Sequence, residues 1–175
     1  MVLQGAAGLA VAWMTPLAAQ DPRTARPMAG DRLAKIDDET ATPLTPADIP
    51  QMSTPILAWP VTPDGVPRSG SRLNRIALVR LDVAALTVRT RSHAADGVVA
   101  YSAVCTHTGC EVGAFLGDEH ALYCDCHESK FDPRDHGRVI DGPAPRSLPA
   151  LPLAMSDGRI IVAAPFTSRP GFEQG

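Results

Sequence analysis

The alternation of hydrophobic and polar positions along the chain predicts short β-strands separated by turns. The clearest strand covers residues 75–81, where apolar residues fall on both faces and indicate a strand that is covered on two sides. The same pattern predicts further short strands at residues 56–59, 87–90, 97–102, 130–132, 138–140, 151–155 and 159–163. No stretch keeps a 3.6-residue period, so we expect an all-β fold of the antiparallel sandwich or barrel-like kind.

Prolines and Asp-Gly pairs mark the places where strands should end. Seven prolines occur in residues 43–67, and because proline cannot donate to a sheet ladder, this stretch should be loop and edge strand. Residues 44–50 within it have room for one helical turn. Residues 21–42 are polar at their start and contain Pro22, Pro27 and Gly30, so we interpret them as a linker.

The first twenty residues are apolar, and the first charged residue is Asp21. A run of this kind ending in small residues is typical of an export signal with its cleavage site. A stretch of about 20 apolar residues is also long enough for a retained membrane anchor, and buried structure is a third interpretation. Gly5, Gly8 and Pro16 favour the signal, although no basic residue precedes the run.

Length and charge narrow the class of protein. A chain of 175 residues is about one domain, which we place at residues 43–170. The net charge is −3, with 16 basic and 19 acidic residues and no basic stripe, so no nucleic-acid partner is expected.

The candidate chemistry lies in two short motifs that contain all four cysteines. They read CTHTGC at residues 105–110 and CDCHES at residues 124–129. Thiolates and imidazoles are ligands of soft or borderline transition metals, so the motifs indicate a metal site. A structural zinc site fits less well, because zinc modules usually pair Cys-x₂₋₄-Cys with His-x₃₋₅-His. A thiol oxidoreductase would use Cys-x-x-Cys, which the chain lacks.

These two motifs, together with the Gly-Pro-Ala-Pro sequence at residues 142–145, resemble the Rieske iron–sulfur proteins. The type resembled is that of cytochrome bc complexes and of the arsenite oxidase small subunit. The resemblance covers roughly residues 97–165 and implies a [2Fe–2S] cluster. It also implies an antiparallel β-sandwich with a small cluster-binding subdomain at about residues 103–147. Gly142 and Pro143 would belong to the proline loop that covers the cluster from a third side.

The resemblance also assigns roles to the cysteines and histidines. Cys105 and Cys124 would hold a buried iron, and His107 and His127 would hold the iron near the surface that takes the electron. Mixed imidazole and thiolate ligation raises the potential above that of plant-type ferredoxins, into about −150 to +300 mV. In the resembled family the two cysteines that are left, Cys110 and Cys126, form a disulfide. A disulfide indicates an oxidising compartment, hence the periplasm or the extracytoplasmic face of a membrane.

Four residues within the motifs or just after them should set the reduction potential and the polarity of the site. Ser129 matches a serine whose hydroxyl bonds a bridging sulfide and raises the potential, whereas Phe131 stands where high-potential relatives have a tyrosine. We therefore expect a middle potential. In the resembled family, quinol-oxidising members often have an apolar residue at the position of Thr108. Glycine is often found at the position of Glu128. A polar tip of this kind favours a protein interface over a quinol pocket.

The function that follows is one-electron transfer, without a substrate-converting site in this chain. We expect the small subunit of an exported oxidoreductase, with a larger catalytic subunit and/or a c-type cytochrome as partner. The alternative is the Rieske subunit of a quinol–cytochrome c reductase, with a possible membrane tether through residues 2–19. His93, His120 and His136 lie in turn-like contexts and are expected to be exposed to solvent.

Overall fold

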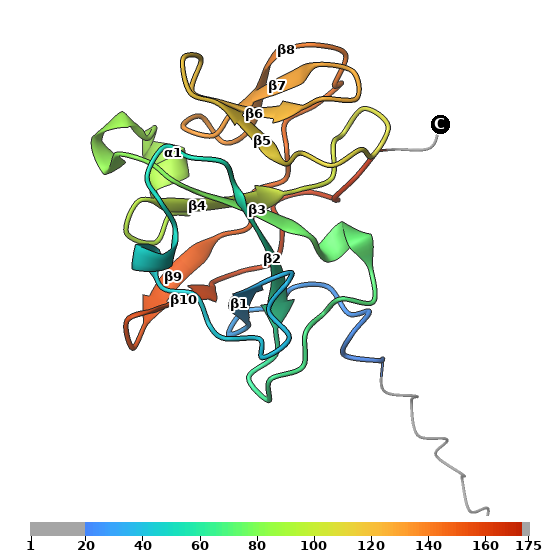
Figure 1. Ribbon diagram of the computed structural model, residues 1–175, viewed down its shortest axis with the longest axis vertical. Helices are drawn as coiled ribbons and strands as arrows, with labels where there is room; N and C mark the ends of the chain where they lie inside the picture. Colours follow the sequence, from blue (N-terminus) through green and yellow to red (C-terminus); the bar gives the residue numbers. More distant parts are fainter. Residues whose placement is uncertain (1–19, 173–175) are drawn as a thin grey trace, which may run out of the picture.

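The computed structural model describes residues 20–172 and shows two antiparallel β-sheets (Figure 1). The larger sheet has six strands in the order β4-β3-β2-β1-β10-β9. Its strands are β1 (Arg32–Lys35), β2 (Ile56–Val61), β3 (Ile76–Arg80), β4 (Val98–Ser102), β9 (Leu153–Ser156) and β10 (Arg159–Val162). The smaller sheet has the order β5-β6-β7-β8, with strands β5 (Ala114–Leu116), β6 (Ala121–Cys124), β7 (Ser129–Asp132) and β8 (Arg138–Asp141). The expected all-β antiparallel fold is confirmed.

Helical structure in the described part is limited to single turns. They are 3₁₀ turns at Pro46–Asp48, Arg72–Asn74 and Val83–Ala85, and the short helix α1 at Val88–Arg91. The turn expected within residues 44–50 is therefore present. The strand expected at residues 87–90 is wrong, because the Thr87 hydroxyl accepts a hydrogen bond from the Thr90 N–H (3.3 Å) and caps α1 instead.

The linker expected over residues 21–42 contains a strand of the larger sheet. β1 pairs with both β2 and β10, and Leu33 within it is fully buried. The residues before it are fixed by a buried ion pair, in which Arg68 Nε donates to Asp31 Oδ2 at 2.6 Å. Arg68 also donates to the carbonyl of Pro22 (3.1 Å). The polar residues next to this four-residue strand made the segment resemble a linker. One of them, Asp31, is polar because it forms the buried ion pair with Arg68.

The proline-rich stretch also departs from expectation at β2, which lies inside the sheet rather than at its edge. β2 pairs with β3 only from Ile56 to Ala58, so Pro60 lies beyond the end of that ladder. Opposite Leu33 of β1, Pro60 still contributes its carbonyl, which accepts from the Arg68 N–H at 2.8 Å. An interior strand can therefore hold this proline because one neighbour ends before reaching it.

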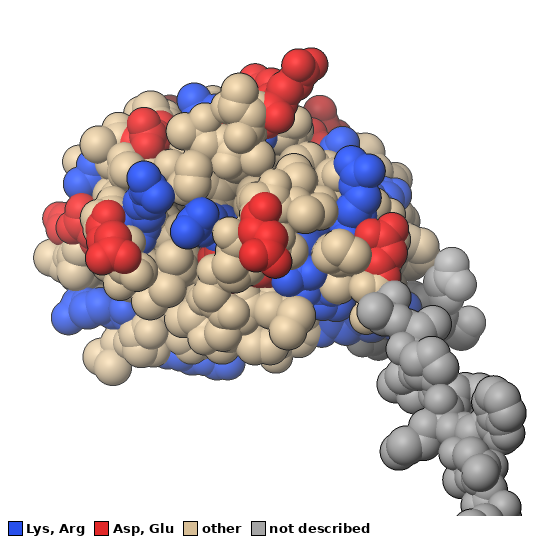
Figure 2. Space-filling view, turned by 90° about the horizontal axis from the view of Figure 1, so that it is seen from below, with Lys and Arg blue, Asp and Glu red and all other residues tan. Residues whose placement is uncertain are grey.

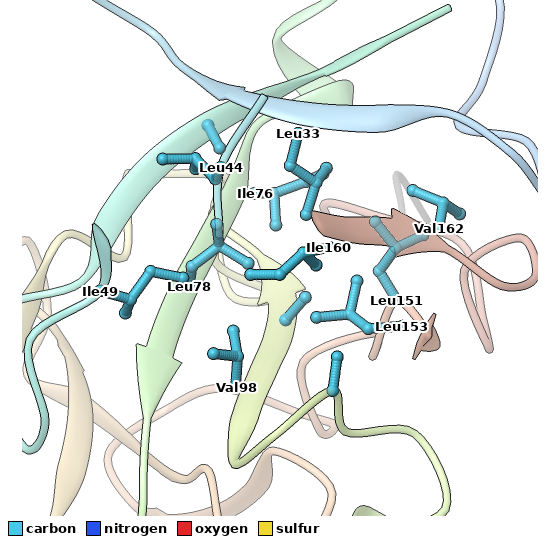
Figure 3. Packing of buried hydrophobic residues seen from close by; sticks show 13 residues of the cluster. Leu33, Leu44, Ile49, Ile76, Leu78, Val98, Leu151, Leu153, Ile160 and Val162 are labelled. Atoms are coloured by element: carbon cyan, nitrogen blue, oxygen red, sulfur yellow. The ribbon is translucent and has the colours of Figure 1, made fainter. Parts of the chain in front are cut away.

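Two hydrophobic cores lie on the two faces of β3 and β4. Ile76 and Leu78 contribute to the core of the larger sheet, shown in Figure 3, whereas Val79 and Val99 contribute to a second core shared with the smaller sheet. The alternation follows from the two-residue period of a strand. The two-sided burial expected for residues 75–81 is confirmed. This arrangement seats the smaller sheet directly on β3 and β4, which bear the loops that lead to the site.

The face that points away from the smaller sheet carries charges of both signs. Figure 2 shows acidic and basic side chains interspersed over this face, without a continuous field of one sign among the described residues. Within residues 20–172, no helix has the length and the apolar character that a bilayer-crossing segment needs. The signal or anchor expected at residues 1–20 falls, except for Gln20, outside the residues that the structure describes.

Candidate metal centre

The first cysteine–histidine motif, residues 105–110, forms a tight turn that we call loop 1. The N–H of Cys105 donates to the carbonyl of Cys110 (2.8 Å), and the N–H of Gly109 donates to the carbonyl of Cys105 (3.0 Å). Gly109 has φ +83°, a conformation that glycine adopts without steric cost. The turn buries Cys105, leaves His107 half-buried and exposes Thr108.

The second motif, residues 124–129, forms the hairpin connection between β6 and β7, which we call loop 2. Cys124 ends β6 and faces Ser129, the first residue of β7, across the ladder. Both are buried, whereas His127 and Glu128 at the tip are exposed. Loop 2 therefore has the same arrangement as loop 1, with its free thiol inside and its imidazole at the surface.

The proline loop, residues 142–145, packs its backbone against loop 2. Gly142 has φ +84°, and a Cβ atom at this position would lie 2.6 Å from Ser129 Cα and 2.7 Å from the carbonyl oxygen of Glu128. Because these are backbone atoms that cannot swing away, only glycine fits here. The next residue, Pro143, is exposed. The loop thus lies directly against Glu128 and Ser129 of loop 2.

A disulfide joins loop 1 to loop 2. It links Cys110 to Cys126, whose Cα atoms are 6.4 Å apart, and leaves Cys105 and Cys124 as the free thiols. The sulfur of Cys124 lies within 4.8 Å of both disulfide sulfurs, so the bond holds the two loops together next to a free thiol. Since Cys110 and Cys126 are bonded to each other, only Cys105 and Cys124 can supply thiolate ligands.

The two imidazoles of the motifs are brought together, one from each loop. The ring centroids of His107 and His127 are 4.6 Å apart, and the ring planes are nearly perpendicular, at 88°. His107 Nδ1 and Ser129 Oγ are buried and find no hydrogen-bond partner in the described part of the chain. Buried polar atoms without a partner are costly, so these two atoms point to a group that binds between the loops. Two thiolates and two imidazoles fit an iron–sulfur cluster of mixed ligation.

Burial controls the protonation of the thiol on loop 2. Removal from water, and secondarily the neighbouring Cys105, raise the pKa of Cys124 to about 11. The thiol is therefore protonated at neutral pH when no metal is bound, and metal binding must displace its proton.

The smaller sheet is fixed on the larger one by contacts close to the loops. The Tyr101 hydroxyl donates to the carbonyl of Pro133 (2.7 Å), and the buried Thr106 hydroxyl donates to the carbonyl of Arg146 (2.7 Å). Phe131 is fully buried in the core that also contains Cys105 and Cys124. A packed core consequently supports both loops.

An antiparallel β-fold with two loops that each combine a buried thiol and an outward imidazole defines an iron–sulfur protein of the Rieske class. The Rieske [2Fe–2S] domain family matches residues 68–152 of the chain. The chain therefore contains a Rieske [2Fe–2S] domain, and its cofactor is a Rieske-type [2Fe–2S] cluster.

Curated relatives share the central part of the chain. The Rieske iron–sulfur subunit of the cytochrome bc1 complex of Streptomyces lividans is 45% identical over 62 residues, which are 35% of this chain and 36% of the relative. A putative Rieske subunit of the respiratory nitrate reductase of Haloferax mediterranei is 43% identical over 76 residues, 43% of this chain and 34% of the relative. The match thus spans about a third of the length of these two relatives.

Among solved structures, the plasma membrane Rieske protein of the cyanobacterium Synechocystis is similar to this chain. The sequence identity is 26% and the TM-score is 0.43, with 69% of this chain and 95% of that chain covered.

The residues that tune the cluster lead to a prediction for its reduction potential. Ser129→Ala should lower the potential by roughly 60 mV or more, because the buried Ser129 hydroxyl, which has no partner among the described residues, is lost as a donor to the cluster, and a hydrogen bond to a charged group contributes about 1.5–3 kcal/mol. Phe131→Tyr should raise it, since a donor is added within the buried core around the cysteines. A redox titration of the purified protein measures both. Tyr123→Phe, at the half-buried position opposite Lys130, is the matched control, and an unchanged potential in Phe131→Tyr contradicts the tuning role.

The structure brings together a second pair of histidines, a contact that the sequence did not predict. His93 and His136 were expected to be exposed, but both are half-buried and their ring centroids are 5.3 Å apart. Their Nδ1 atoms are buried, with no hydrogen-bond partner among the described residues. The backbone N–H of His136 donates to the Thr90 hydroxyl (2.8 Å), which fixes the position of this residue. His93 follows α1 and His136 lies in the turn between β7 and β8, far apart in the sequence, so no local pattern signals the contact.

This pair predicts a loss of stability in acid. Burial, followed by the nearby Arg89, lowers the pKa of His93 and of His136 below the ordinary value of about 6.5; Asp135 opposes this weakly at His136. Because the unfolded chain then binds more protons than the folded one, stability is present above about pH 6.5 and falls as the pH drops below it, with a slope of at most about two protons. Thermal midpoints between pH 5 and 8 measure this loss.

The matched variant is His136→Asn, since asparagine tolerates the φ of +54° at this position. It should flatten the decline below pH 6.5. An equally steep decline in this variant would assign the acid sensitivity to other groups.

Proposed function

We propose that this chain is a one-electron carrier whose cluster is held by Cys105, Cys124, His107 and His127. The observation that carries the proposal is the division of the four side chains, with both thiols buried and the imidazoles 4.6 Å apart at the surface. The cluster, when bound, supplies a single electron at a potential raised by its imidazole ligands. The protein shields the thiolate side from water and presents the imidazole side to a partner.

We further propose that the carrier works as a subunit of a larger respiratory oxidoreductase. The names of the Streptomyces and Haloferax relatives, both subunits of respiratory complexes, support this assembly. Our preferred form is a small subunit that receives electrons from a catalytic subunit and passes them to a c-type cytochrome. It is favoured by the polar tip beside the histidines, where Thr108, Asp125 and Glu128 are all exposed. Polar rims of this kind suit transient protein contacts.

The second candidate is the Rieske subunit of a quinol–cytochrome c reductase. The name of the Streptomyces relative, a subunit of a cytochrome bc1 complex, favours it specifically. Here the electron would come from quinol rather than from a catalytic subunit.

We place the carrier in the periplasm or on the extracytoplasmic face of the membrane. The disulfide between Cys110 and Cys126 supports an oxidising compartment. We keep the Rieske domain at residues 43–170, preceded by β1 of the same sheet, with the cluster-binding subdomain at about residues 103–147. A membrane tether through residues 2–19 belongs to the same proposal.

Affinity purification of the tagged full-length chain from its own cells tests the assembly. A co-purifying catalytic oxidoreductase subunit supports the preferred form, and a cytochrome b supports the quinol form. Purification of the chain without either subunit contradicts both.

Stopped-flow mixing of the reduced protein with an oxidised c-type cytochrome tests electron transfer directly. We expect one cytochrome reduced per protein, with a rate that falls as salt rises if Glu128 and Asp125 help to dock the cytochrome. Glu128→Gly is the informative variant, because glycine accepts the φ of +62° at this position without strain, so the charged side chain is removed without distorting the backbone. Absence of cytochrome reduction by the reduced protein contradicts electron transfer to such a partner.

A further inference from the structure

The C-terminal segment, residues 165–172, returns from the larger sheet to loop 1. After β10, Phe166 packs against the core of the larger sheet, and the N–H of Thr167 donates to the carbonyl of Ala150 (2.9 Å). Figure 1 shows this segment running up to the connection between β4 and β5, which contains loop 1. Residues at the very end of the described chain therefore lie beside a loop more than sixty positions earlier in the sequence.

Arg146 holds this segment in place. Its Nη2 donates to the carbonyls of Arg169 (2.9 Å) and Gly171 (2.5 Å). The carbonyl of the same residue accepts from the hydroxyl of Thr106, which is buried in loop 1. Arg146 thus connects the C-terminal segment through its side chain and loop 1 through its backbone.

The segment ends with an aromatic ring packed on loop 1. Phe172 Cδ1 and Cε1 lie 2.9 and 3.1 Å from the place where a Cβ atom of Gly109 would be. On the same residue, Arg72 donates to the Gly109 carbonyl. The preceding Gly171 is in close contact with Leu73, since a Cβ here would lie 2.9 Å from Leu73 Cδ2. Gly109 is therefore held by an aromatic ring, a guanidinium group and the disulfide-bonded Cys110 that follows it.

We propose that residues 165–172 form a strap that positions loop 1, and that Phe172 is its positioning residue. Loop 1 is a six-residue turn closed by the two backbone hydrogen bonds at Cys105 and Gly109. Loop 1 cannot open without separating Gly109 from Phe172, so the strap adds the burial of that ring to the cost of opening. The disulfide fixes only the C-terminal end of the loop, at Cys110.

The strap matters for the cluster because the proposed ligands Cys105 and His107 lie on the loop that it holds. This consequence rests on the ligand assignment of the proposed function, whereas the positioning of the loop does not. A strap that keeps loop 1 closed retards loss of iron and keeps the imidazole of His107 in a single orientation.

Hydrogen exchange of the full-length, cluster-loaded protein tests the strap. In Phe172→Ala, the amides of Cys105 and Gly109 should exchange about tenfold faster, because an aromatic ring of a residue that is 36% exposed, and hence mostly buried in the closed state, is lost. The amides of Val99 in β4 and Lys130 in β7 should be unchanged. Phe172→Leu should restore most of the protection. Val88→Ala is the matched control, since it removes an apolar side chain that is 84% exposed on α1.

Arg146→Met is the second variant, since it removes the anchors of the strap and leaves the carbonyl that binds Thr106. It should accelerate exchange in loop 1 as Phe172→Ala does, and the double variant should show little more than either single change. Release of iron to a chelator should accelerate by the same factor. Unchanged exchange at Cys105 and Gly109 in both single variants would overturn the strap. Loss of the Rieske signal from the unsubstituted protein would instead overturn the cluster ligands, because the exchange measurement does not depend on them.

Discussion

Cys124→Ala is expected to abolish the cluster, with iron, sulfide and visible absorbance falling to background. The physical reason is that Cys124 is one of only two free cysteines, and both are buried. No other sulfur can replace it, because Cys110 and Cys126 are bonded to each other. The sheets should still form, since their cores consist of aliphatic and aromatic side chains and lose only one thiol. Metal analysis and circular dichroism of the purified variant measure the two outcomes separately.

Cys126→Ser is the matched control for this prediction. It also removes a sulfur from loop 2, but from a residue that is not a proposed ligand, so it should keep iron and sulfide while losing the disulfide. Retention of the cluster in Cys124→Ala would show that the thiolate ligands have been assigned wrongly.

The second large effect is expected from the disulfide. The double variant Cys110→Ala/Cys126→Ala should lower the free energy of unfolding by about 3 kcal/mol, because a bond across 16 residues restricts the unfolded chain. The cluster should be lost more readily as well, since Cys124 lies beside the bond and loop 1 loses its covalent link to loop 2. Denaturant unfolding of the two proteins measures the difference.

Treatment with a reductant provides the control. The unsubstituted protein should approach the stability of the double variant, whereas the double variant should not respond. Equal unfolding midpoints for the oxidised protein and the double variant would contradict a stabilising role for the bond.

The sequence predicted the fold best where a strand is long and buried on both faces. Residues 75–81 have this pattern, and β3 separates the two cores as expected. β1, β5 and β6 were missed because they have only three or four residues, too few to display a period, and no Asp-Gly pair marks their ends as it does between β9 and β10. Residues 88–91 form α1 rather than the expected strand, because the Thr87 hydroxyl accepts a hydrogen bond from the Thr90 N–H and caps the helix. The pattern of apolar residues does not indicate such a side-chain cap.

The candidate site could be predicted from the sequence to the extent that its chemistry is local. The two motifs placed thiol and imidazole side chains on two loops, and the resemblance supplied the Cys110–Cys126 disulfide that the structure contains. The contacts that hold the loops were not predictable, because they join distant residues. Phe172 on Gly109, Arg146 between two segments, and His93 against His136 leave no local signal in the chain.

β3 and β4 are buried on both faces, so the smaller sheet shares a core with the larger one. A small sheet can therefore carry a redox site without a separate core of its own. The core between the sheets includes the free cysteines, Phe131 and Tyr101. The two proposed thiolate ligands therefore belong to a packed core, and a change in packing near Phe131 should act on the site directly.

Electron paramagnetic resonance of the dithionite-reduced, full-length protein tests the central claim most directly. We expect a rhombic signal of the Rieske type, present in the unsubstituted protein and in Cys126→Ser and absent in Cys124→Ala. A reduced protein without this signal, or with the signal of a cluster held by cysteines alone, would contradict a cluster held by Cys105, Cys124, His107 and His127.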